Sequence, residues 1–260
     1  MNRLTRFTSW AIVAGLAVGA VASNAQDLQT MSKNANQWVM TGRTYDLQRY
    51  SPLDQITTSN VKNLHVAWTM STGTLRGHEG NPLVVGSTMY LHSSFPNKVY
   101  ALDLSKPGAP QLWQFTPEQS AEAIPIACCD VVNRGLAFDP KTNRLFIELL
   151  AGDVLALDAK TGKQAWRVKS VDFKKGETMT NAPMVVDDVL LTGISGGEFG
   201  VRGRITAFST QDGHELWRTY STGPDKDVGI TDNTLKSPYP SAQGKDLGVS
   251  TWQGDEWQRG

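Results

Sequence analysis

The sequence has no excess of charge of either sign, since 25 lysines and arginines balance 25 aspartates and glutamates. A neutral chain offers no electrostatic reason to bind nucleic acid or an anionic membrane surface, so we expect neither as a partner. Long apolar runs are also missing. The longest covers only residues 10–22, whereas a membrane-spanning helix needs about 20 residues, so we expect no integral membrane segment.

The short apolar run has the flanks of an export signal. Arg3 and Arg6 precede it, and Ser23-Asn24-Ala25 follows it with small residues that a signal peptidase can accept. A short membrane anchor is the alternative interpretation. We predict that residues 1–25 form a signal peptide and that the mature chain begins at Gln26.

Cysteine is scarce, and the two that occur, Cys128 and Cys129, are neighbours. Their Cα atoms lie about 3.8 Å apart, which is shorter than the usual disulfide separation of roughly 4.4–6.8 Å. A strained disulfide between neighbours and a pair of buried thiols are both compatible with the sequence. Half of a metal site is a weaker hypothesis, because no other cysteine exists and the four histidines are scattered.

Turn formers and tryptophan are plentiful, which favours an all-β protein. The chain has 24 glycines, 12 prolines and eight tryptophans. It also repeats: an apolar strand with the pattern Ala-Leu-Asp or similar is followed ten to twelve residues after its alanine by a tryptophan. The three copies are Val99–Asp103 with Trp113, Val154–Asp158 with Trp166, and Ile205–Ser209 with Trp217.

A further hairpin precedes each copy, as in Pro82–Val85 followed by Met89–Leu91. Four short strands per unit, at a period of roughly 45–55 residues, are typical of β-propeller blades. We place blades around residues 64–115, 124–168 and 180–219, with the tryptophans packing between blades. Trp68 marks an earlier terminal strand, and we expect a helix and loop over Asn36–Asn63.

Three clear repeats are fewer than the four to eight blades of an ordinary propeller. We therefore expect residues 26–260 to be the N-terminal part of a larger propeller, covering roughly its first three to four blades. An open arc of this kind would leave apolar faces and strand edges uncovered.

Polar residues that depart from the repeat cluster in the loops, where propellers bind ligands around the central channel. Five of them are Glu79, Arg134, Thr180, Ser195 and Glu198. This set suits a planar ligand with several carboxylates, because arginine binds carboxylates through two parallel hydrogen bonds and hydroxyls and glycine N–H groups hold further oxygens. A carboxylate in a dry channel also favours a hard, oxygen-preferring metal ion.

Each residue also has an ordinary structural interpretation. Glu198 in a glycine-rich loop could be a solvated turn residue, Arg134 could be the partner in a structural ion pair, and His78 could be a loop residue with satisfied hydrogen bonds. The glycine run 193–203 is neither a dinucleotide fingerprint nor a phosphate loop, since the required patterns are absent.

Several segments closely resemble those of methanol and ethanol dehydrogenases that depend on pyrroloquinoline quinone (PQQ). They follow in order along nearly the whole mature chain: Arg43–Leu53, Gly77–Gly80, Asp130–Gly135, Ser195–Gly203 and Thr251–Asp255. The resemblance implies an eight-bladed periplasmic propeller that oxidises primary alcohols with PQQ and a calcium or lanthanide ion. It also implies a cytochrome c electron acceptor and a homodimer of the full-length protein.

By this resemblance, individual residues acquire roles. Glu198 is similar to a metal ligand, and Cys128 and Cys129 are similar to a vicinal disulfide against one face of the quinone. The cysteine pair and six further residues are similar to PQQ-binding positions. Those positions are Glu79, Cys128, Cys129, Arg134, Thr180, Ser195, Gly196 and Gly197. Many methanol dehydrogenases have alanine where this chain has Gly197, and we expect backbone contacts to tolerate that difference.

The resemblance also implies a tryptophan that stacks on the other face of the quinone, an asparagine metal ligand and a catalytic aspartate base, all of which would lie beyond Gly260. We therefore expect this chain to be a fragment that does not oxidise alcohols alone, with no catalytic base of its own. A propeller of the same repeat type that serves as a non-enzymatic binding or assembly scaffold in the cell envelope is the alternative. The site loops favour the enzyme, because a scaffold has no need for them.

Overall fold

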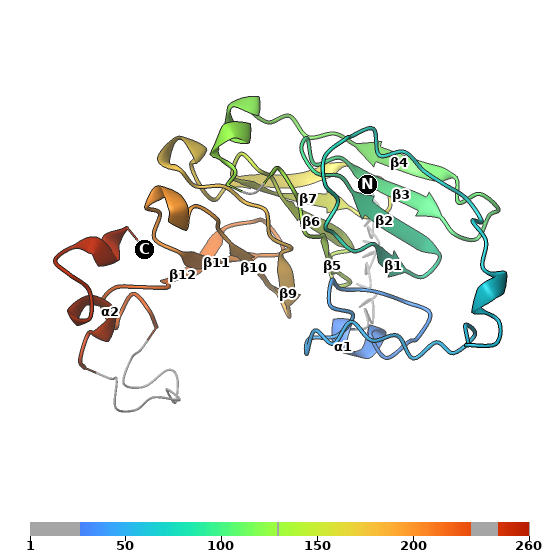
Figure 1. Ribbon diagram of the computed structural model, residues 1–260, viewed down its shortest axis with the longest axis horizontal. Coiled ribbons are helices and arrows are strands. Elements are labelled where there is room, and N and C mark those ends of the chain that lie inside the picture. The colour runs from blue at the N-terminus through green and yellow to red at the C-terminus, as the bar shows by residue number, and fades with distance from the viewer. Residues whose placement is uncertain (1–26, 129, 230–243, 260) are drawn as a thin grey trace, which may run out of the picture.

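The computed structural model describes residues 27–128, 130–229 and 244–259, which contain three four-stranded antiparallel sheets. The sheets follow one another along an arc in chain order (Figure 1). The first sheet comprises β1 (Leu83–Val85), β2 (Thr88–His92), β3 (Val99–Asp103) and β4 (Gln111–Phe115). The second comprises β5 (Ala137–Asp139), β6 (Arg144–Glu148), β7 (Asp153–Asp158) and β8 (Gln164–Lys169), and the third β9 (Met184–Val186), β10 (Val189–Gly193), β11 (Arg204–Ser209) and β12 (Glu215–Tyr220).

Each sheet is a meander in which every strand pairs with its neighbour in the chain. The first hairpin of a sheet closes through a tight turn with a positive backbone φ, at Gly86 (φ 57°) in the first sheet and at Asp187 (φ 54°) in the third. Such turns match the right-handed twist of the strands they join. The repeated four-stranded unit predicted from the sequence is thus confirmed.

The middle sheet forms the centre of the hydrophobic core. Its strand β7 contains Val154, Leu155, Ala156 and Leu157, all with 0% of their surface exposed. Because the flanking sheets cover both of its faces, β7 is a continuous apolar run and lacks the alternation of a half-buried strand. The outer strand β8 does alternate between exposed and partly buried residues.

Successive sheets are joined by their tryptophans. The indole Nε1 of Trp113 donates to the carbonyl of Ala159 at 3.1 Å, and that of Trp166 donates to Thr210 at 3.2 Å. Each indole also covers the glycine of the next sheet's outer turn, where a Cβ on Gly162 or Gly213 would lie 2.6 Å or 2.8 Å from the ring. These glycines therefore make room for the preceding tryptophan as well as turning the chain.

Replacing Trp166 with phenylalanine should reduce the free energy of unfolding by about 1–2 kcal/mol, because the hydrogen bond to Thr210 is lost and the ring fills less of the interface. Trp217 occupies the same position in the third sheet but is 47% exposed, so Trp217→Phe should change stability by less than about 0.5 kcal/mol. Urea unfolding of both variants measures the difference. Equal losses of unfolding free energy in the two variants would contradict the role of Trp166 in joining successive sheets.

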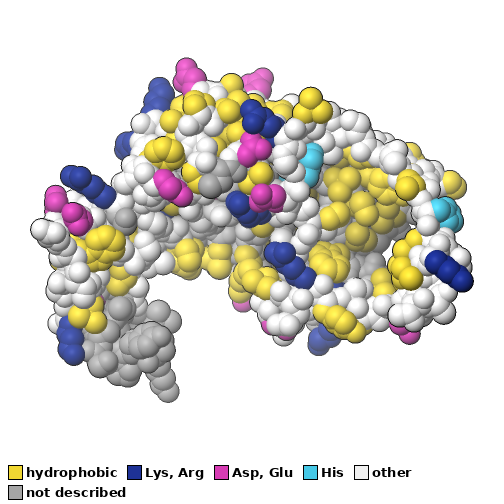
Figure 2. All heavy atoms as spheres, viewed as in Figure 1, with side chains coloured by type: hydrophobic (Ala, Val, Ile, Leu, Met, Phe, Trp, Pro, Cys, Tyr) yellow, Lys and Arg dark blue, Asp and Glu magenta, His cyan; other side chains and the backbone are white. Residues whose placement is uncertain are grey.

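The terminal sheets expose apolar side chains of the kind that the middle sheet buries. Hydrophobic side chains gather over the β1–β4 sheet in Figure 2. In the third sheet Ile205, Leu216 and Trp217 are 48%, 44% and 47% exposed. This agrees with the uncovered faces expected of an open arc.

The remaining segments contain short helices. They are the α-helices α1 (Leu28–Met31) and α2 (Leu247–Ser250) and the 3₁₀ helices η1 (Val61–Asn63), η2 (Ala121–Ile126), η3 (Phe173–Lys175), η4 (Gly197–Phe199) and η6 (Glu256–Gln258). The helix expected within Asn36–Asn63 is largely wrong: α1 precedes that range, which is mostly loop apart from η1. The N-cap of α1 is Asp27, whose side chain accepts a hydrogen bond from Thr30 N–H.

The strand expected at Trp68 is likewise not found, because no described strand pairs with residues 64–70. A strand needs such a partner to satisfy its backbone groups. Among the described residues there is also no helix with the length and apolar character needed to cross a membrane.

Candidate functional site

The candidate site lies where connecting segments meet at one end of the sheets. Residues 130–135 lead into the second sheet, residues 178–182 lead into the third, and residues 194–203 join β10 to β11. Thr178 and Ser195 form a two-way backbone bridge, with N–H to carbonyl distances of 3.0 and 2.8 Å. This bridge fixes the start of the glycine-rich loop against the segment that carries Thr180.

Four of the predicted ligand-binding residues form one connected chain of polar contacts. The Nη2 of Arg134 pairs with the Glu79 carboxylate at 3.0 Å. Its Nη1 donates to the Oγ1 and the carbonyl of Thr180 at 2.9 and 3.2 Å, and the Thr180 and Ser195 hydroxyls lie 3.1 Å apart. The structure thus brings together Glu79, from the segment that precedes the first sheet, with residues from the three later segments named above.

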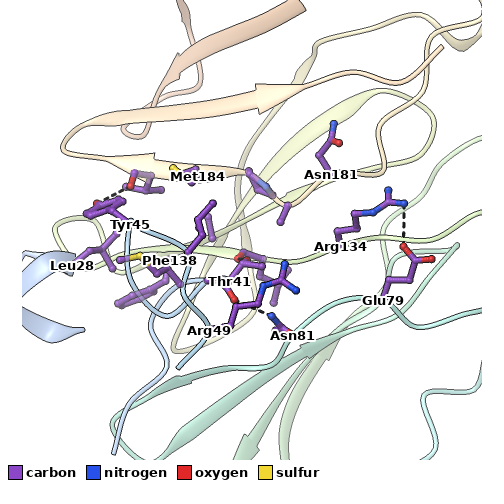
Figure 3. A pocket seen from close by; sticks show the side chains of 18 residues that line it. Leu28, Thr41, Tyr45, Arg49, Glu79, Asn81, Arg134, Phe138, Asn181 and Met184 are labelled. Atoms are coloured by element: carbon purple, nitrogen blue, oxygen red, sulfur yellow. Dashed lines mark hydrogen bonds and ion pairs between the residues drawn. The ribbon is translucent and has the colours of Figure 1, made fainter. Parts of the chain in front are cut away.

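The ion pair at the head of this chain is accessible. The side chains of Arg134 and Glu79 are 45% and 48% exposed, so the pair adds at most about 1 kcal/mol to stability. Figure 3 shows Arg134 extending to Glu79 at one end of a pocket. Its guanidinium is therefore held in place by Thr180 and remains open to a ligand.

The pocket has a volume of about 470 Å³ and a polar and an apolar end. Glu79, Asn81, Arg134 and Asn181 line it near the ion pair, and Figure 3 shows Phe138, Met184 and Tyr45 farther along. This volume lies in the range of small-molecule sites, roughly 300–1,000 Å³.

The glycine-rich loop uses its glycines unequally. Gly196 has φ 137°, and a Cβ there would lie 2.3 Å from the carbonyl oxygen of Gly176. Gly200 has φ 72° and ends η4, whereas a Cβ on Gly197 would meet nothing within 4 Å. Gly196 is therefore required by the fold, and Gly197 leaves open backbone beside the loop.

Glu198, the predicted metal ligand, lies on η4 and is exposed. Among the described residues no group of three or more histidine, cysteine, aspartate or glutamate side chains could hold a metal ion. Glu198 is thus available as one ligand but is not brought together with others, so its metal-binding role stays a prediction.

The Glu79 loop is tied to Asp130 through a contact that sequence reasoning missed. Arg76 Nη1 pairs with Asp130 Oδ1 at 3.1 Å, which links Gly77–Gly80 to the residue after Cys129. The sequence signal that could have identified Arg76 is its position directly before Gly77–Gly80. Cys128 is exposed and Cys129 lies outside the described residues, so the predicted disulfide remains a prediction.

Two titratable groups are buried behind the site, and neither was singled out from the sequence. Burial lowers the pKa of His92 to about 4, against a smaller opposing effect of the Asn133 carbonyl. Burial likewise raises the pKa of Glu148 to about 8, although N–H groups of Gly193 and Asn181 partly favour its charged form. At neutral pH both side chains are therefore largely uncharged.

Glu148 should make the chain less stable as pH rises from 4.5 to 8. In that interval the folded chain keeps a proton on Glu148 that the unfolded chain releases, so the free energy of unfolding falls by about 1.4 kcal/mol per pH unit. Glu148→Gln should therefore gain about 2–3 kcal/mol relative to the original chain between pH 5 and pH 7. Urea unfolding at each pH measures this, and exposed Glu215→Gln should leave the pH dependence unchanged. A parallel pH profile for Glu148→Gln would contradict a buried, protonated acid.

Comparison with known proteins identifies the family. The sequence profile of the PQQ family, described as the β-propeller domain of glucose, ethanol and alcohol dehydrogenases, matches residues 38–252. The chain belongs to this family. Its three sheets are thus blades of a PQQ-type propeller, which confirms the family and fold that the site motifs indicated.

Individual relatives of this family are similar over most of the chain. It is 48% identical over 241 residues to the lanthanide-dependent methanol dehydrogenase of Methylacidiphilum fumariolicum (strain SolV), covering 93% of this chain and 39% of that protein. It is 46% identical over 268 residues to methanol dehydrogenase [cytochrome c] subunit 1 of Methylorubrum extorquens (strain ATCC 14718 / DSM 1338 / JCM 2805 / NCIMB 9133 / AM1), covering 100% of this chain and 42% of that protein.

A solved europium-containing methanol dehydrogenase superimposes with a TM-score of 0.85 at 50% identity, over 90% of this chain and 40% of that one. The chain therefore spans about two fifths of the length of the relatives it matches.

Proposed function

We propose that the protein to which this propeller segment contributes oxidises primary alcohols such as methanol or ethanol to aldehydes. PQQ and a calcium or lanthanide ion serve as cofactors, a cytochrome c accepts the electrons, and the reaction takes place in the periplasm. The relatives named as methanol dehydrogenases support this proposal. The name of one includes lanthanide dependence, and the name of another includes cytochrome c. The homodimer of the full-length protein belongs to the same proposal.

The observation that carries the proposal is the polar chain from Glu79 through Arg134 and Thr180 to Ser195. PQQ is a planar quinone with three carboxyl groups, and a guanidinium held beside two hydroxyls fits such an anion. The close approach of backbone at Gly196 and the open space at Gly197 suit a flat ligand against the loop. The residues present thus fit PQQ.

Within this site the chain's residues bind and orient. Arg134 neutralises carboxylate charge, Thr180 and Ser195 provide hydroxyl hydrogen bonds, and Glu198 provides one carboxylate ligand to the metal ion. When bound, PQQ supplies a two-electron acceptor whose quinone the metal ion polarises. We assign no catalytic base to this chain, and the vicinal disulfide at Cys128 and Cys129 is proposed as the surface facing the quinone.

Titration of the chain with PQQ, with and without Ca²⁺ or La³⁺, tests the proposal through the quenching of tryptophan fluorescence. We expect saturable binding that tightens when the metal ion is present. An absence of binding under both conditions would favour the scaffold alternative and contradict the cofactor site.

Glu198→Gln should abolish the tightening by metal while leaving metal-free PQQ binding within about threefold, because the amide is a far weaker ligand for a hard cation than the carboxylate. The loss should amount to about tenfold in apparent affinity at saturating metal. Exposed Glu122→Gln is the matched control and should behave like the original chain. Metal dependence that survives in Glu198→Gln would show that another group binds the ion.

A further inference from the structure

His92 and Glu148 occupy equivalent positions in successive blades. They are the last residues of β2 and β6 and pair with Val99, the first residue of β3, and with Val154, the second residue of β7. Their side chains are buried, with 7% and 0% of the residue surface exposed. Burying a titratable group costs free energy unless its polar atoms have hydrogen-bond or charge partners. The neighbours of these two side chains therefore indicate what their burial achieves.

His92 contacts two segments that carry site residues. Its Nε2 lies 3.0 Å from the carbonyl oxygen of Asn133, the residue before Arg134. Its ring also fills the space beside Gly80, the residue after Glu79, where a Cβ would lie 1.9 Å from the ring. His92 therefore spans the two chain segments whose side chains form the Glu79–Arg134 pair.

Glu148 lies in the corresponding place one blade later. Its carboxyl group faces the backbone N–H groups of Gly193 and Asn181 and the Asn181 side chain, although neither carboxyl oxygen makes a hydrogen bond of standard geometry. Asn181 follows Thr180, and Gly193 precedes Ser195 by two residues. The Glu148 carbonyl also accepts from Asn133 Nδ2 at 2.8 Å.

We propose that His92 and Glu148 are positioning residues that hold the cofactor-binding segments in register across the blade boundaries. His92 holds the segments of Glu79 and Arg134, and Glu148 holds those of Thr180 and Ser195. The identity of the ligand rests on the proposed function, whereas the positioning itself is a property of the chain without ligand.

Packing alone does not require polar side chains at these positions. Leu149 and Leu150, which follow Glu148 directly, are each 0% exposed, so apolar residues fill this part of the core. A buried polar group differs from leucine in the directions that it imposes on its partners. The partners of both residues lie one or two positions along the chain from Glu79, Arg134, Thr180 and Ser195.

Amide hydrogen exchange of the ligand-free chain tests the positioning directly. The reporters are two site amides with defined acceptors: Arg134 N–H donates to Thr180 O, and Ser195 N–H to Thr178 O. Glu148→Leu should speed exchange at Ser195 by about tenfold or more, while Glu148→Gln, which mimics the protonated acid, should stay within about threefold. His92→Phe should instead speed exchange at Arg134.

Thr206→Val is the matched control, because it removes a buried hydroxyl that makes no hydrogen bond to either segment. It should leave both reporters unchanged. Exchange that rises equally throughout the chain, or that rises as much in Thr206→Val, would overturn the proposal. If Glu148→Leu is too unstable to fold, the isosteric Glu148→Gln still tests the proposal. Loss of Ser195 protection in Glu148→Gln would also overturn it.

PQQ titration of the same variants, at fixed Ca²⁺, gives the second measurement. Glu148→Leu and His92→Phe should each weaken PQQ binding by about tenfold or more, and Glu148→Gln should restore it to within about threefold. If the original chain binds no PQQ, the proposed function fails while the exchange data still decide the positioning. If PQQ binds equally to all variants, the positioning proposal is wrong although the cofactor site stands.

Discussion

Arg134→Met should weaken PQQ binding by about 100-fold or more, the largest loss expected from one side chain of the site. The guanidinium is the cation of the polar chain: it pairs with Glu79 at 3.0 Å and is fixed by Thr180 Oγ1 at 2.9 Å. Without it, the Glu79 carboxylate would face the carboxylates of PQQ with no neutralising charge between them. Repulsion then adds to the lost hydrogen bonds.

Stability should respond far less, because the ion pair is half exposed and contributes at most about 1 kcal/mol. The PQQ affinity of Arg134→Lys should lie between those of the original chain and Arg134→Met. Lysine keeps the positive charge but lacks the planar guanidinium that binds a carboxylate through two hydrogen bonds. Arg167→Met is the matched control, because Arg167 pairs with Asp153 in the middle blade at 2.7 Å. Fluorescence titration and urea unfolding of all three variants separate affinity from stability. Arg134→Met that binds PQQ within threefold of the original chain would rule out this anchoring role.

Gly196→Ala should reduce the free energy of unfolding by about 3–5 kcal/mol. The backbone at Gly196 has φ 137°, which L-residues rarely adopt, and the added Cβ would lie 2.3 Å from the Gly176 carbonyl oxygen. That oxygen belongs to backbone, so the overlap cannot be relieved by rotating a side chain. Movement of the loop would also displace Ser195 and Glu198, and PQQ binding should fall with stability.

The neighbouring glycine provides the control for this variant. Gly197→Ala adds the same methyl group, but nothing lies within 4 Å of the new Cβ and no positive φ opposes it. Its stability should remain within about 0.5 kcal/mol of the original chain. Denaturation curves of the two variants measure the contrast, and a Gly196→Ala protein as stable as Gly197→Ala would show that the loop relaxes freely.

Much of the architecture was predictable because blades are local. The strands β1–β3 and β9–β11 follow from short apolar runs separated by turn residues, and each pairs with its chain neighbour. The strand expected at Trp68 shows the limit of that reasoning, since a strand there depends on a partner sheet that its own residues do not specify. The helix expected in 36–63 was largely wrong for a different reason, because the segment has no strong helical periodicity.

For the site, the sequence by itself determined which side chains are present and where they recur relative to the blades. Arg134 and Glu198 stood out as departures from the repeat, whereas Gly196 and Gly197 were proposed as binding positions only through the family resemblance. Their unequal roles were not, because the difference between Gly196 and Gly197 depends on one carbonyl oxygen from Gly176, twenty residues earlier in the chain.

Tertiary structure alone decided the contacts between blades. Trp113 and Trp166 pack over glycines that the sequence indicated only as turn residues. Arg76 reaches Asp130, and His92 and Glu148 lie against the segments that precede Arg134 and follow Thr180. Blade repeats are encoded by neighbouring residues, whereas these contacts join residues far apart in the chain, such as Arg76 and Asp130, which are 54 positions apart. The packing angle between two sheets sets them, and no local pattern records that angle.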